Sequence, residues 1–470
     1  MQNRKLIFWG TGRIGQRMLC FSKVIGVQPD LLFDSDKDKW GICIDDVRII
    51  SPSEVHKYMS AEVLITCKTS GEIRRKLLDM GFPEKNIYSV ECVESRLIEL
   101  AYIRRKTDDK RNSSDDSKGV NRKVIFCLDN GAAMGGVEIW ALQQEKLLSV
   151  RGIDVSYILG DPRHRELVFP EAHTHLIIND EKDNILIKWI ETIKGIADEG
   201  ECSIIVNFAG NGLTAAAAAK IMNPNIKIYA VLHCDEEVYY SQYIQYLQVI
   251  DYCIAVSKKI MHTMISRSFP KDRISVMPWH IEISKMFERE YCVNGKLVIG
   301  YAGRITKQNK RADLLVDIIA EVCKRTDDCY FKIAGIGDYL DVIKKYVIDQ
   351  KLTKRVKFCG HVPHNEIIDF WYSTDVAVSC SDIEGKSISL AEAMSAGNVP
   401  VVTNASGVED LVKNGVNGFV YPVGDVEGIV SKIIYLTENK KLLSTIGNQA
   451  HSAIIKMNRE YDRWEREIQI

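Results

Sequence analysis

The sequence has little that would place the protein in a membrane, on nucleic acid or in a disulfide framework. None of its apolar runs approaches the roughly 20 residues that a transmembrane helix needs. Its 62 basic and 63 acidic side chains leave a formal net charge of −1, which gives no global attraction to nucleic acid or anionic lipid. The 13 cysteines are odd in number and never spaced as CxxC, which is typical of core residues in a reducing compartment and excludes a zinc ribbon.

The N-terminal segment also lacks the apolar stretch of a signal peptide, because MQNRKLIFWGTG passes directly into a strand and a glycine turn. We therefore expect a cytoplasmic protein, and peripheral contact with the inner face of the membrane stays open. At 470 residues the chain exceeds one ordinary hydrophobic core, so two or three domains are expected.

Apolar strand-like runs alternate with helical stretches on both sides of one polar segment. That segment, RRKTDDKRNSSDDSKGVNR, has the composition of a flexible linker, and the alternation predicts parallel α/β units around it. The boundaries that we expect are a Rossmann-like nucleotide-binding-type domain at 1–103, the linker at 104–122, one lobe at 123–285, a second lobe at 286–455 and a C-terminal helix at 456–470.

The C-terminal helical pattern begins near Lys432, and we expect it to break near Gly447. Residues 456–470 could cross back onto the lobe at 123–285, with Tyr461 and Trp464 as contacts. An ordinary terminal helix of the second lobe is the alternative.

A glycine-rich turn, GTGRIG, follows the first predicted strand and opens a helix. Gly10, Gly12 and Gly15, with Asp34 at the end of the next strand, match the dinucleotide-binding fingerprint. A domain of about 100 residues is too short to hold both a cofactor and a dedicated catalytic domain. Two roles stay open. The domain could bind a nucleotide, a nucleotide-sugar or NAD(P), or it could serve docking or regulation without a ligand. The segment Asp34-Ser35-Asp36 mimics a metal-binding DxD pattern, but we expect no metal site.

The most informative segment is SDIEGKSISLAEAMSAGN, at residues 381–398, between two apolar strands. Its loop carboxylate Glu384 precedes Gly385 and a helix that carries Glu392. The amides of Lys386, Ser387 and Ile388 would lie at the positive end of that helix, where an anion such as phosphate is favoured. Helical side chains lean toward the N-terminus, so Glu392 can reach the same ligand. Taken alone, the two glutamates could equally face solvent.

Residues 122–470 resemble the retaining nucleotide-sugar glycosyltransferases of family 4, also called group 1. The resemblance is carried in register by these residues: Ser381, Glu384-Gly385, Glu392-Ala393-Met394, Gly397, Pro400-Val401-Val402, Gly407-Val408-Glu409 and Asn414-Gly415-Val416-Asn417-Gly418. It implies a GT-B fold, in which two Rossmann-like lobes face each other, here preceded by the additional small Rossmann-like domain.

The resemblance also implies roles for individual residues. Catalytic candidates are His233, which would face the transferring sugar, Arg304 and Lys310, which would grip the donor phosphates, and Glu384, which would contact the sugar. Glu392 would bind the ribose. The donor-binding set is completed by Gly135, Gly136, Gly335, Gly337, Val362, Gly385, Lys386, Ser387 and Ile388.

Several neighbouring positions stay ambiguous at this stage. Lys307 and Arg311 compete with Lys310 for the phosphate role, and Arg311 replaces a glycine that is usual in the family, which puts the loop conformation in doubt. Lys386 replaces an apolar or aromatic residue and could meet phosphate, an anionic sugar or solvent. We expect residues 235–237 to be solvated, although Asp235 could meet an acceptor hydroxyl group, and residues 207–212 could contact the acceptor.

The activity implied is transfer of a sugar from a nucleoside-diphosphate sugar, most simply a UDP- or GDP-sugar, to a glycan or glycolipid acceptor. The anomeric configuration would be retained, no cofactor or metal would be required, and the setting would be bacterial cell-surface polysaccharide assembly. The alternatives are an NAD(P)-dependent enzyme that modifies sugar nucleotides and a non-catalytic binding scaffold with the GT-B fold. The base, the sugar, the acceptor and the oligomeric state stay undecided.

Overall fold

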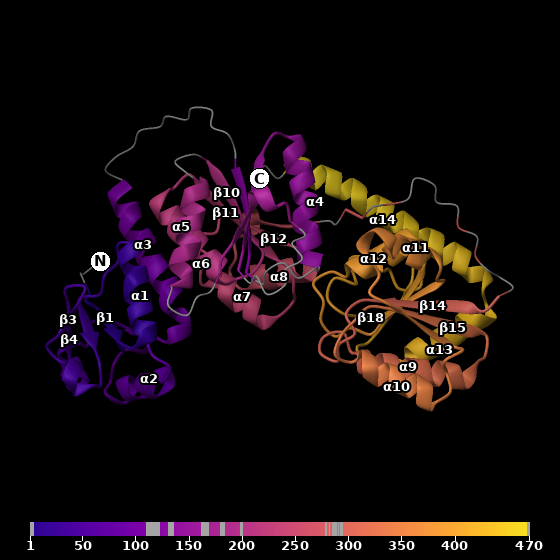
Figure 1. Cartoon of the computed structure of the whole chain (residues 1–470), viewed down its shortest axis with the longest axis horizontal. Helices are drawn as coiled ribbons and strands as arrows, with labels where there is room; N and C mark the ends of the chain where they lie inside the picture. The colour runs from indigo at the N-terminus through magenta and orange to yellow at the C-terminus, as the bar shows by residue number, and fades with distance from the viewer. Residues whose placement is uncertain are drawn as a thin grey trace. The chain divides into compact units, whose positions relative to one another are not determined.

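The computed structural model describes residues 4–109, 123–129, 136–160, 169–178, 184–197, 201–277, 280, 281, 283, 289, 291 and 295–467. The chain forms two compact units, of which the first holds residues 1–231 and 238–253 and the second holds residues 232–237 and 254–470. Within the described residues there are three β-sheets, each built almost entirely from parallel strands with helices in the connections (Figure 1).

The first sheet has the strand order β3-β4-β2-β1-β5-β6, and only the β3–β4 pair is antiparallel. Its strands are β1 (Leu6–Trp9), β2 (Leu31–Phe33), β3 (Cys43–Ile44), β4 (Val47–Ile50), β5 (Glu62–Ile65) and β6 (Ile87–Tyr88). Its helices are α1 (Arg13–Val24), α2 (Ser70–Asp79) and α3 (Val93–Asp109), with 3-10 turns η1 (Lys37–Lys39), η2 (Pro52–Tyr58), η3 (Glu84–Asn86) and η4 (Val90–Cys92). Every residue of β1 is buried, as expected for the central strand of a sheet covered on both faces.

The second sheet has the order β13-β12-β11-β10-β7-β8-β9. Its strands are β7 (Lys123–Leu128), β8 (Asp154–Leu159), β9 (Thr174–Leu176), β10 (Cys202–Val206), β11 (Ile226–Leu232), β12 (Tyr252–Ala255) and β13 (Ile274–Val276). The connecting elements are α4 (Gly136–Val150), η5 (Glu171–His173), α5 (Ile185–Ala197), α6 (Asn211–Met222), α7 (Glu237–Ile244), α8 (Lys258–Ser266) and η6 (Lys271–Arg273).

The third sheet has the order β16-β15-β14-β17-β18-β19. Its strands are β14 (Leu297–Ala302), β15 (Cys329–Ala334), β16 (Val356–Gly360), β17 (Val376–Ser379), β18 (Val399–Thr403) and β19 (Phe419–Tyr421). Its helices are α9 (Ala312–Arg325), α10 (Leu340–Asp349), η7 (His364–Glu366), α11 (Ile367–Tyr372), α12 (Ile388–Ser395), α13 (Val426–Glu438) and α14 (Lys441–Glu467). Strand residues and the inner faces of α9 and α13 form one continuous core, in which Ile299, Leu315 and Ile433 are fully buried.

In the first unit, α3 packs against α6 and so joins the first sheet's helices to those of the second sheet. The packing face of α6 is rich in alanine, since Ala215–Ala219 are all buried, and small side chains let two helices approach closely. Ser95 donates a hydrogen bond to Gln245 at 2.8 Å and supports the same junction. The helix α3 continues to Asp109, so residues 104–109 of the expected linker are helical, and its residues 110–122 lie outside the described residues.

The break between the two C-terminal helices lies at a different position from the one that the sequence predicts. The break falls at Asn439–Lys440, between α13 and α14, and α14 runs through Gly447 without interruption. A Cβ at residue 447 would overlap the Tyr291 hydroxyl and the carbonyl oxygen of Gly397, so this glycine serves close packing and not a helix break. Tyr461 is buried, and its ring lies 5.6 Å from that of His280. The side chain of Trp464 lies outside the described residues, and the crossing of this helix onto the lobe at 123–285 stays a prediction.

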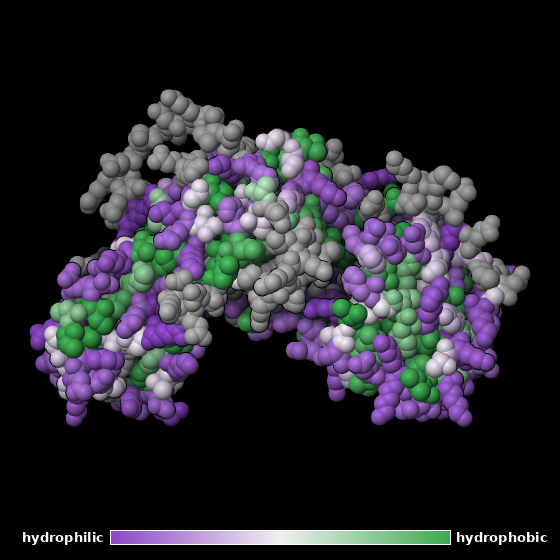
Figure 2. Space-filling model, viewed as in Figure 1, coloured by the Kyte–Doolittle hydropathy of each residue, from purple (hydrophilic) through white to green (hydrophobic). Residues whose placement is uncertain are grey.

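The surface is mixed in character. On the face drawn in Figure 2, small hydrophobic clusters lie among predominantly hydrophilic residues. None of the described helices combines the length and the apolar composition needed to cross a bilayer.

Candidate functional site

The candidate site lies at the carboxyl ends of two neighbouring strands of the third sheet. Strand β14 pairs with β15 on one side and β17 on the other, so the order of the sheet reverses between β14 and β17. In open parallel sheets such a switch point leaves a crevice for ligands at the carboxyl ends of the strands. The loop after β14 holds residues 303–311, and the loop after β17 holds residues 380–387.

Two glycines in the neighbouring loop have a packing role. Gly335 has φ +134°, and a Cβ there would overlap the carbonyl oxygen of Gly303. A Cβ at Gly337 would likewise overlap the backbone of Ile305. Only glycine allows these two backbones to lie so close, so Gly335 and Gly337 set the shape of the loop after β14.

Arg311 resolves the doubt about that loop. It has φ +50° and ψ +48°, which is the left-handed conformation that the usual glycine would adopt without strain. Its guanidinium group donates to both oxygens of Asp382 at 3.0 and 3.1 Å and to Asp313 at 3.1 Å. Arg311 therefore ties the two loops together and is engaged by two carboxylates, and which of the basic residues of this loop binds phosphate stays a prediction.

Lys310 and Glu384 form an ion pair across the two loops, and the exposed fractions of their side chains are only 20% and 12%. Both line a cavity of about 20 Å³, together with Tyr301, Gly303 and Ser387. That volume accommodates about one water molecule, so this conformation of the loops is closed around the ion pair. Arg304 is exposed, and its carbonyl oxygen accepts a hydrogen bond of 2.9 Å from the Tyr301 hydroxyl.

The helix α12 presents its N-terminus to the same cavity. Ser387 is the N-cap residue and accepts a hydrogen bond from the amide of Leu390, which is a preferred way to satisfy the free amides of a first turn. Ser389 donates to the carbonyl oxygen of Ala302 at 2.7 Å, so α12 is fixed to the end of β14. Ile388 is the first helical residue.

Glu392 is a buried carboxylate on α12, and its Oε1 lies 3.4 Å from Nδ1 of His364. The sequence interpretation missed His364, although it lies two positions after Val362, which was expected to bind the donor. Val362 packs against a hydrophobic cluster that includes Trp371 and Ala393. The structure thus adds a histidine beside the Glu392 carboxylate, and Val362 packs against the cluster to which α12 contributes Ala393.

His233 meets the site through its backbone. A Cβ at Gly385 would overlap the carbonyl oxygen of His233, so the Glu384-Gly385 loop lies directly on that peptide. Burial lowers the pKa of the His233 imidazole to about 3. The ring is therefore neutral at physiological pH, which suits hydrogen bonding and excludes proton donation by an imidazolium.

Lys386 does not line the cavity between the two loops. The charges that act on its ammonium group belong to Asp410, Lys258, Glu460 and Glu409, and burial lowers its pKa to about 8. Gly407 packs on the backbone of Gly385 and Lys386, where a Cβ would be too close. These acidic groups are not among the partners that the sequence left open for this lysine, and its role towards a donor stays a prediction.

The acidic residues after His233 are partly or fully exposed, as expected, and each also has a partner within the chain. Asp235 lies 2.8 Å from the Lys259 ammonium. Glu236 accepts from the Asn309 side-chain amide at 3.2 Å. Glu237 forms an ion pair with Arg267.

At the second sheet, Gly135 lies outside the described residues and Gly136 is the first residue of α4. The sequence interpretation gave no role to Asp129. Its carboxylate accepts from the amide of Gly212 at 3.1 and 3.2 Å, at the N-terminus of α6, and burial raises its pKa to about 6. The anion-binding end of α6, which belongs to the segment expected to contact an acceptor, is thus occupied by a carboxylate of the chain itself.

At the first sheet, Gly10 follows β1, and a Cβ at Gly15 would overlap the carbonyl oxygen of Gly10. A Cβ at Gly12 would meet no atom within 4 Å, so the turn is compact around Gly15 and open at Gly12. The carboxylate of Asp34 accepts from the amide of Thr11 at 2.9 Å, from the Thr11 hydroxyl and from the amide of Asp36 at 2.9 Å. A ribose diol would have to compete with these internal donors, and the nucleotide role of this turn stays a prediction. Among the described residues, no group of three His, Cys, Asp or Glu side chains is arranged to hold a metal ion.

The geometry agrees with comparisons to known protein families. Residues 283–453 match the family described as Glycosyl transferases group 1, and residues 2–88 match the family C2185-like, N-terminal. The chain therefore carries a group 1 glycosyltransferase domain on a GT-B fold, with an additional N-terminal α/β domain that has its own sheet. The predicted GT-B fold and the group 1 resemblance are confirmed.

Individual relatives match this chain at low sequence identity and over only part of its length. The GPI3 subunit of phosphatidylinositol N-acetylglucosaminyltransferase from Saccharomyces cerevisiae is 29% identical over 232 residues, which are 47% of this chain and 50% of the relative. The capsular polysaccharide biosynthesis glycosyltransferase CapM of Staphylococcus aureus is 27% identical over 265 residues, 52% of this chain and 69% of CapM. The chain thus spans about half the length of the first of these relatives.

Among solved structures, Anabaena HepE in complex with UDP-glucose aligns with a TM-score of 0.61 and 18% identity. The alignment covers 74% of this chain and 100% of HepE. At this identity the likeness supports the fold alone.

Proposed function

We propose that the protein is a glycosyltransferase that moves a sugar from a nucleoside-diphosphate sugar to a glycan or glycolipid acceptor with retention of the anomeric configuration. The observation that carries the proposal is the meeting of Lys310, Glu384 and the N-terminus of α12 around one cavity at the switch point of the group 1 domain. Positive groups and a helix N-terminus suit a diphosphate, and the carboxylate suits sugar hydroxyl groups.

The main chemical task is to stabilise the diphosphate leaving group. Lys310 supplies a point charge and Arg304 a planar fork, and the amides at residues 386–388 supply the positive end of a helix dipole. In this reaction the bond between the anomeric carbon and the diphosphate oxygen breaks while the acceptor oxygen bonds to the same face of that carbon. The acceptor proton passes to the departing phosphate, and preorganised charges lower the barrier because they act where negative charge develops.

The carboxylates bind and do not act as nucleophiles in this proposal. Glu384 contacts the sugar, and it forms an ion pair with Lys310. Glu392 accepts from the ribose hydroxyl groups. His233, neutral because burial lowers its pKa to about 3, positions sugar hydroxyl groups by hydrogen bonding.

The class of donor and acceptor is drawn from the relatives. HepE was solved with UDP-glucose, which favours a UDP-sugar over a GDP-sugar here. The name of CapM refers to capsular polysaccharide, and that of the yeast subunit to phosphatidylinositol. We therefore place the reaction in cell-surface polysaccharide assembly, on the cytoplasmic side of the membrane, with the protein in peripheral contact where the acceptor is lipid-linked.

The test is a transfer assay with purified variants and a panel of UDP- and GDP-sugars, in which the anomeric configuration of the product is read by proton NMR. Glu392→Ala should raise the donor KM, and Arg304→Ala should lower kcat, with unchanged thermal unfolding in both. Arg325→Ala is the matched control, because Arg325 forms its ion pairs with Glu321 and Glu427 on the outer helices of the same domain. Transfer rates that stay at the wild-type level in both site variants, or an inverted product, would contradict the proposal.

A further inference from the structure

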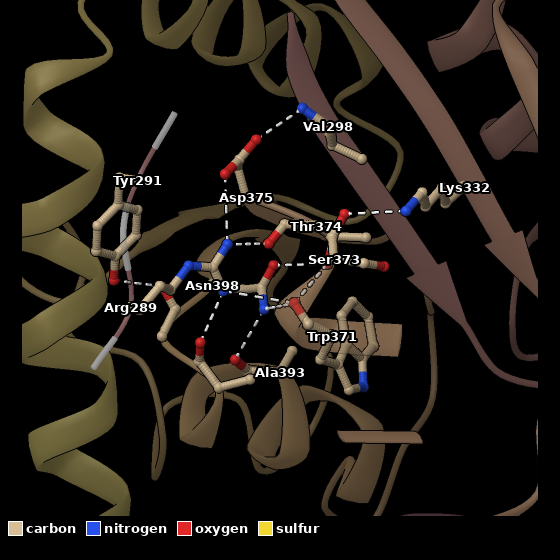
Figure 3. A network of polar contacts seen from close by, with 12 residues as sticks. Arg289, Tyr291, Val298, Lys332, Trp371, Ser373, Thr374, Asp375, Ala393 and Asn398 are labelled. Atoms are coloured by element: carbon tan, nitrogen blue, oxygen red, sulfur yellow. Dashed lines mark hydrogen bonds and ion pairs between the residues drawn. The ribbon is translucent and has the colours of Figure 1, made fainter. Parts of the chain in front are cut away.

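Arg289 precedes the third sheet and is almost completely buried, with 4% of its side chain exposed. Its guanidinium group donates to the carbonyl oxygens of Ala396 at 2.7 Å and Trp371 at 3.4 Å, and to that of Thr374 (Figure 3). It also lies 3.3 Å from the carboxylate of Asp375, which in turn accepts from the amide of Val298 at 2.9 Å. A buried cation is thus balanced by one carboxylate and by peptide oxygens.

Those peptide oxygens belong to the C-terminal ends of two helices. Ala396 is the C-cap residue of α12, and Trp371 and Thr374 flank the end of α11. The last carbonyl groups of a helix have no partner within the helix, and a cation there is favoured by the helix dipole. Arg289 therefore supplies both hydrogen bonds and the favourable charge to two helix ends at once.

Other donors secure the same end of α12. The Tyr291 hydroxyl donates to the carbonyl oxygen of Gly397 at 2.9 Å. Asn398 donates to Ala393 at 3.2 Å and to Trp371 at 2.8 Å, so it links the two helices (Figure 3). Nδ1 of His451 lies 2.6 Å from the carbonyl oxygen of Ser395.

The opposite end of α12 is the donor end of the proposed site. Ser387 caps it, and the helix carries Glu392. Because α12 has only eight residues, a shift or tilt at its C-terminus is transmitted to Glu392 and to the first-turn amides. Misplacement of a binding group by about 1 Å can cost about a hundredfold in catalysis.

We propose that Arg289 is a positioning residue for the nucleotide-sugar, which acts through α12 without touching the ligand. The inference rests on the proposed function of the site. It assigns to Arg289 a selective effect on donor binding, because its contacts hold the helix that carries Glu392 and the phosphate-binding amides. Acceptor binding does not depend on it.

The structure provides a matched control. Lys332 donates to the carbonyl oxygen of Ser373 at 3.2 Å, beside the end of α11 (Figure 3). It makes a hydrogen bond of the same kind to the neighbouring peptide, but it is not bonded to α12. Lys332→Met therefore removes a basic side chain and a helix-end hydrogen bond without freeing α12.

The experiment compares wild type, Arg289→Met, Arg289→Lys and Lys332→Met at a temperature where each is fully folded. Calorimetric titration with UDP and GDP gives nucleotide affinity, and steady-state kinetics give the donor KM, the acceptor KM and kcat. Arg289→Met should weaken nucleotide affinity and raise the donor KM about tenfold or more, as expected for a misplaced binding group, with an unchanged acceptor KM. Added ethylguanidinium should restore part of that affinity in Arg289→Met and none in wild type, and Lys332→Met should match wild type.

Two outcomes overturn the inference: nucleotide affinity in Arg289→Met equal to that of wild type, or equal increases in the KM for donor and acceptor. If Arg289→Met fails to fold, Arg289→Lys and Tyr291→Phe carry the test, and both should show a smaller selective rise in the donor KM. If the wild-type protein binds neither nucleotide, it is the proposed function that fails. Wild-type binding with no difference in the variants contradicts the role of Arg289 alone.

Discussion

Backbone strain and ion pairs have opposite effects on the stability of the protein at Arg311, and substitutions at this residue separate the two. The left-handed backbone, with φ +50°, costs a residue with a Cβ about 1–2 kcal/mol. The ion pairs with Asp313 and Asp382 offset this cost, and each contributes about 0.2–1 kcal/mol because the partners are partly exposed. Arg311→Ala keeps the strain and loses both pairs, so it should destabilise the protein by about 0.4–2 kcal/mol.

Arg311→Gly loses the same pairs but releases the strain. The greater freedom of glycine in the unfolded chain takes back about 0.4–1 kcal/mol, so the glycine variant should be more stable than the alanine variant by about 1 kcal/mol. For a unit of this size, that difference corresponds to about 2–4 °C in the unfolding midpoint. Differential scanning calorimetry of the two variants measures it directly.

Lys351 serves as the control for the backbone effect. It has φ +58°, and no ion pair of its side chain is found in the described part of the chain. Lys351→Gly should therefore also unfold at a higher temperature than Lys351→Ala. Equal midpoints for Arg311→Gly and Arg311→Ala, with the expected difference at Lys351, would refute the reasoning for Arg311.

Two further predictions concern other parts of the chain. Gly385→Ala should abolish transfer and lower the unfolding midpoint, because its Cβ would overlap the carbonyl oxygen of His233. Gly195→Ala, inside α5 with open space around it, should leave transfer unchanged and should not lower the midpoint, since alanine is favoured over glycine inside a helix. Full activity of Gly385→Ala would contradict the close packing. For Asp129, burial raises the pKa from its ordinary value of 3.8 to about 6, so the native state binds the proton more tightly than the unfolded chain and stability falls as pH rises through that range. Asp129→Asn should remove this fall and be more stable than wild type at pH 7. Urea unfolding between pH 4 and 8 measures the free energy of unfolding of both proteins. Parallel plots of that free energy against pH would show that the pKa of the Asp129 carboxyl group is not raised.

The sequence was sufficient for the fold class because its signals are local and repeated. Buried strands such as those that end at Ala302 and Ser379 are continuous apolar runs, and a loop and a helix follow each. The motif around Glu384 and Glu392 also lies within one strand–loop–helix unit, so a local pattern was enough to single out both carboxylates. The finer roles of these residues stay predictions.

The remainder depended on contacts between residues far apart in the sequence. Nothing near Arg289 in the chain indicates that its guanidinium group donates hydrogen bonds to the carbonyl oxygens of residues 371, 374 and 396. The pairing of Arg311 with Asp382 spans 71 positions, and the break expected at Gly447 was wrong because the partner of that glycine, Tyr291, is equally remote. Nothing near Gly335 and Gly337 in the chain indicates that they accommodate the backbone of residues 303 and 305, and their role in donor binding stays a prediction.

Hydrogen–deuterium exchange of the full chain, with and without a panel of UDP-, GDP-, ADP- and CMP-sugars, tests the central claim most directly. The account predicts that one class of donor protects the amides of residues 303–311 and 384–392, and that Glu392→Ala reduces this protection. Protection confined to the turn at residues 10–15 and the segment around Asp34, with none in the group 1 domain, would contradict it.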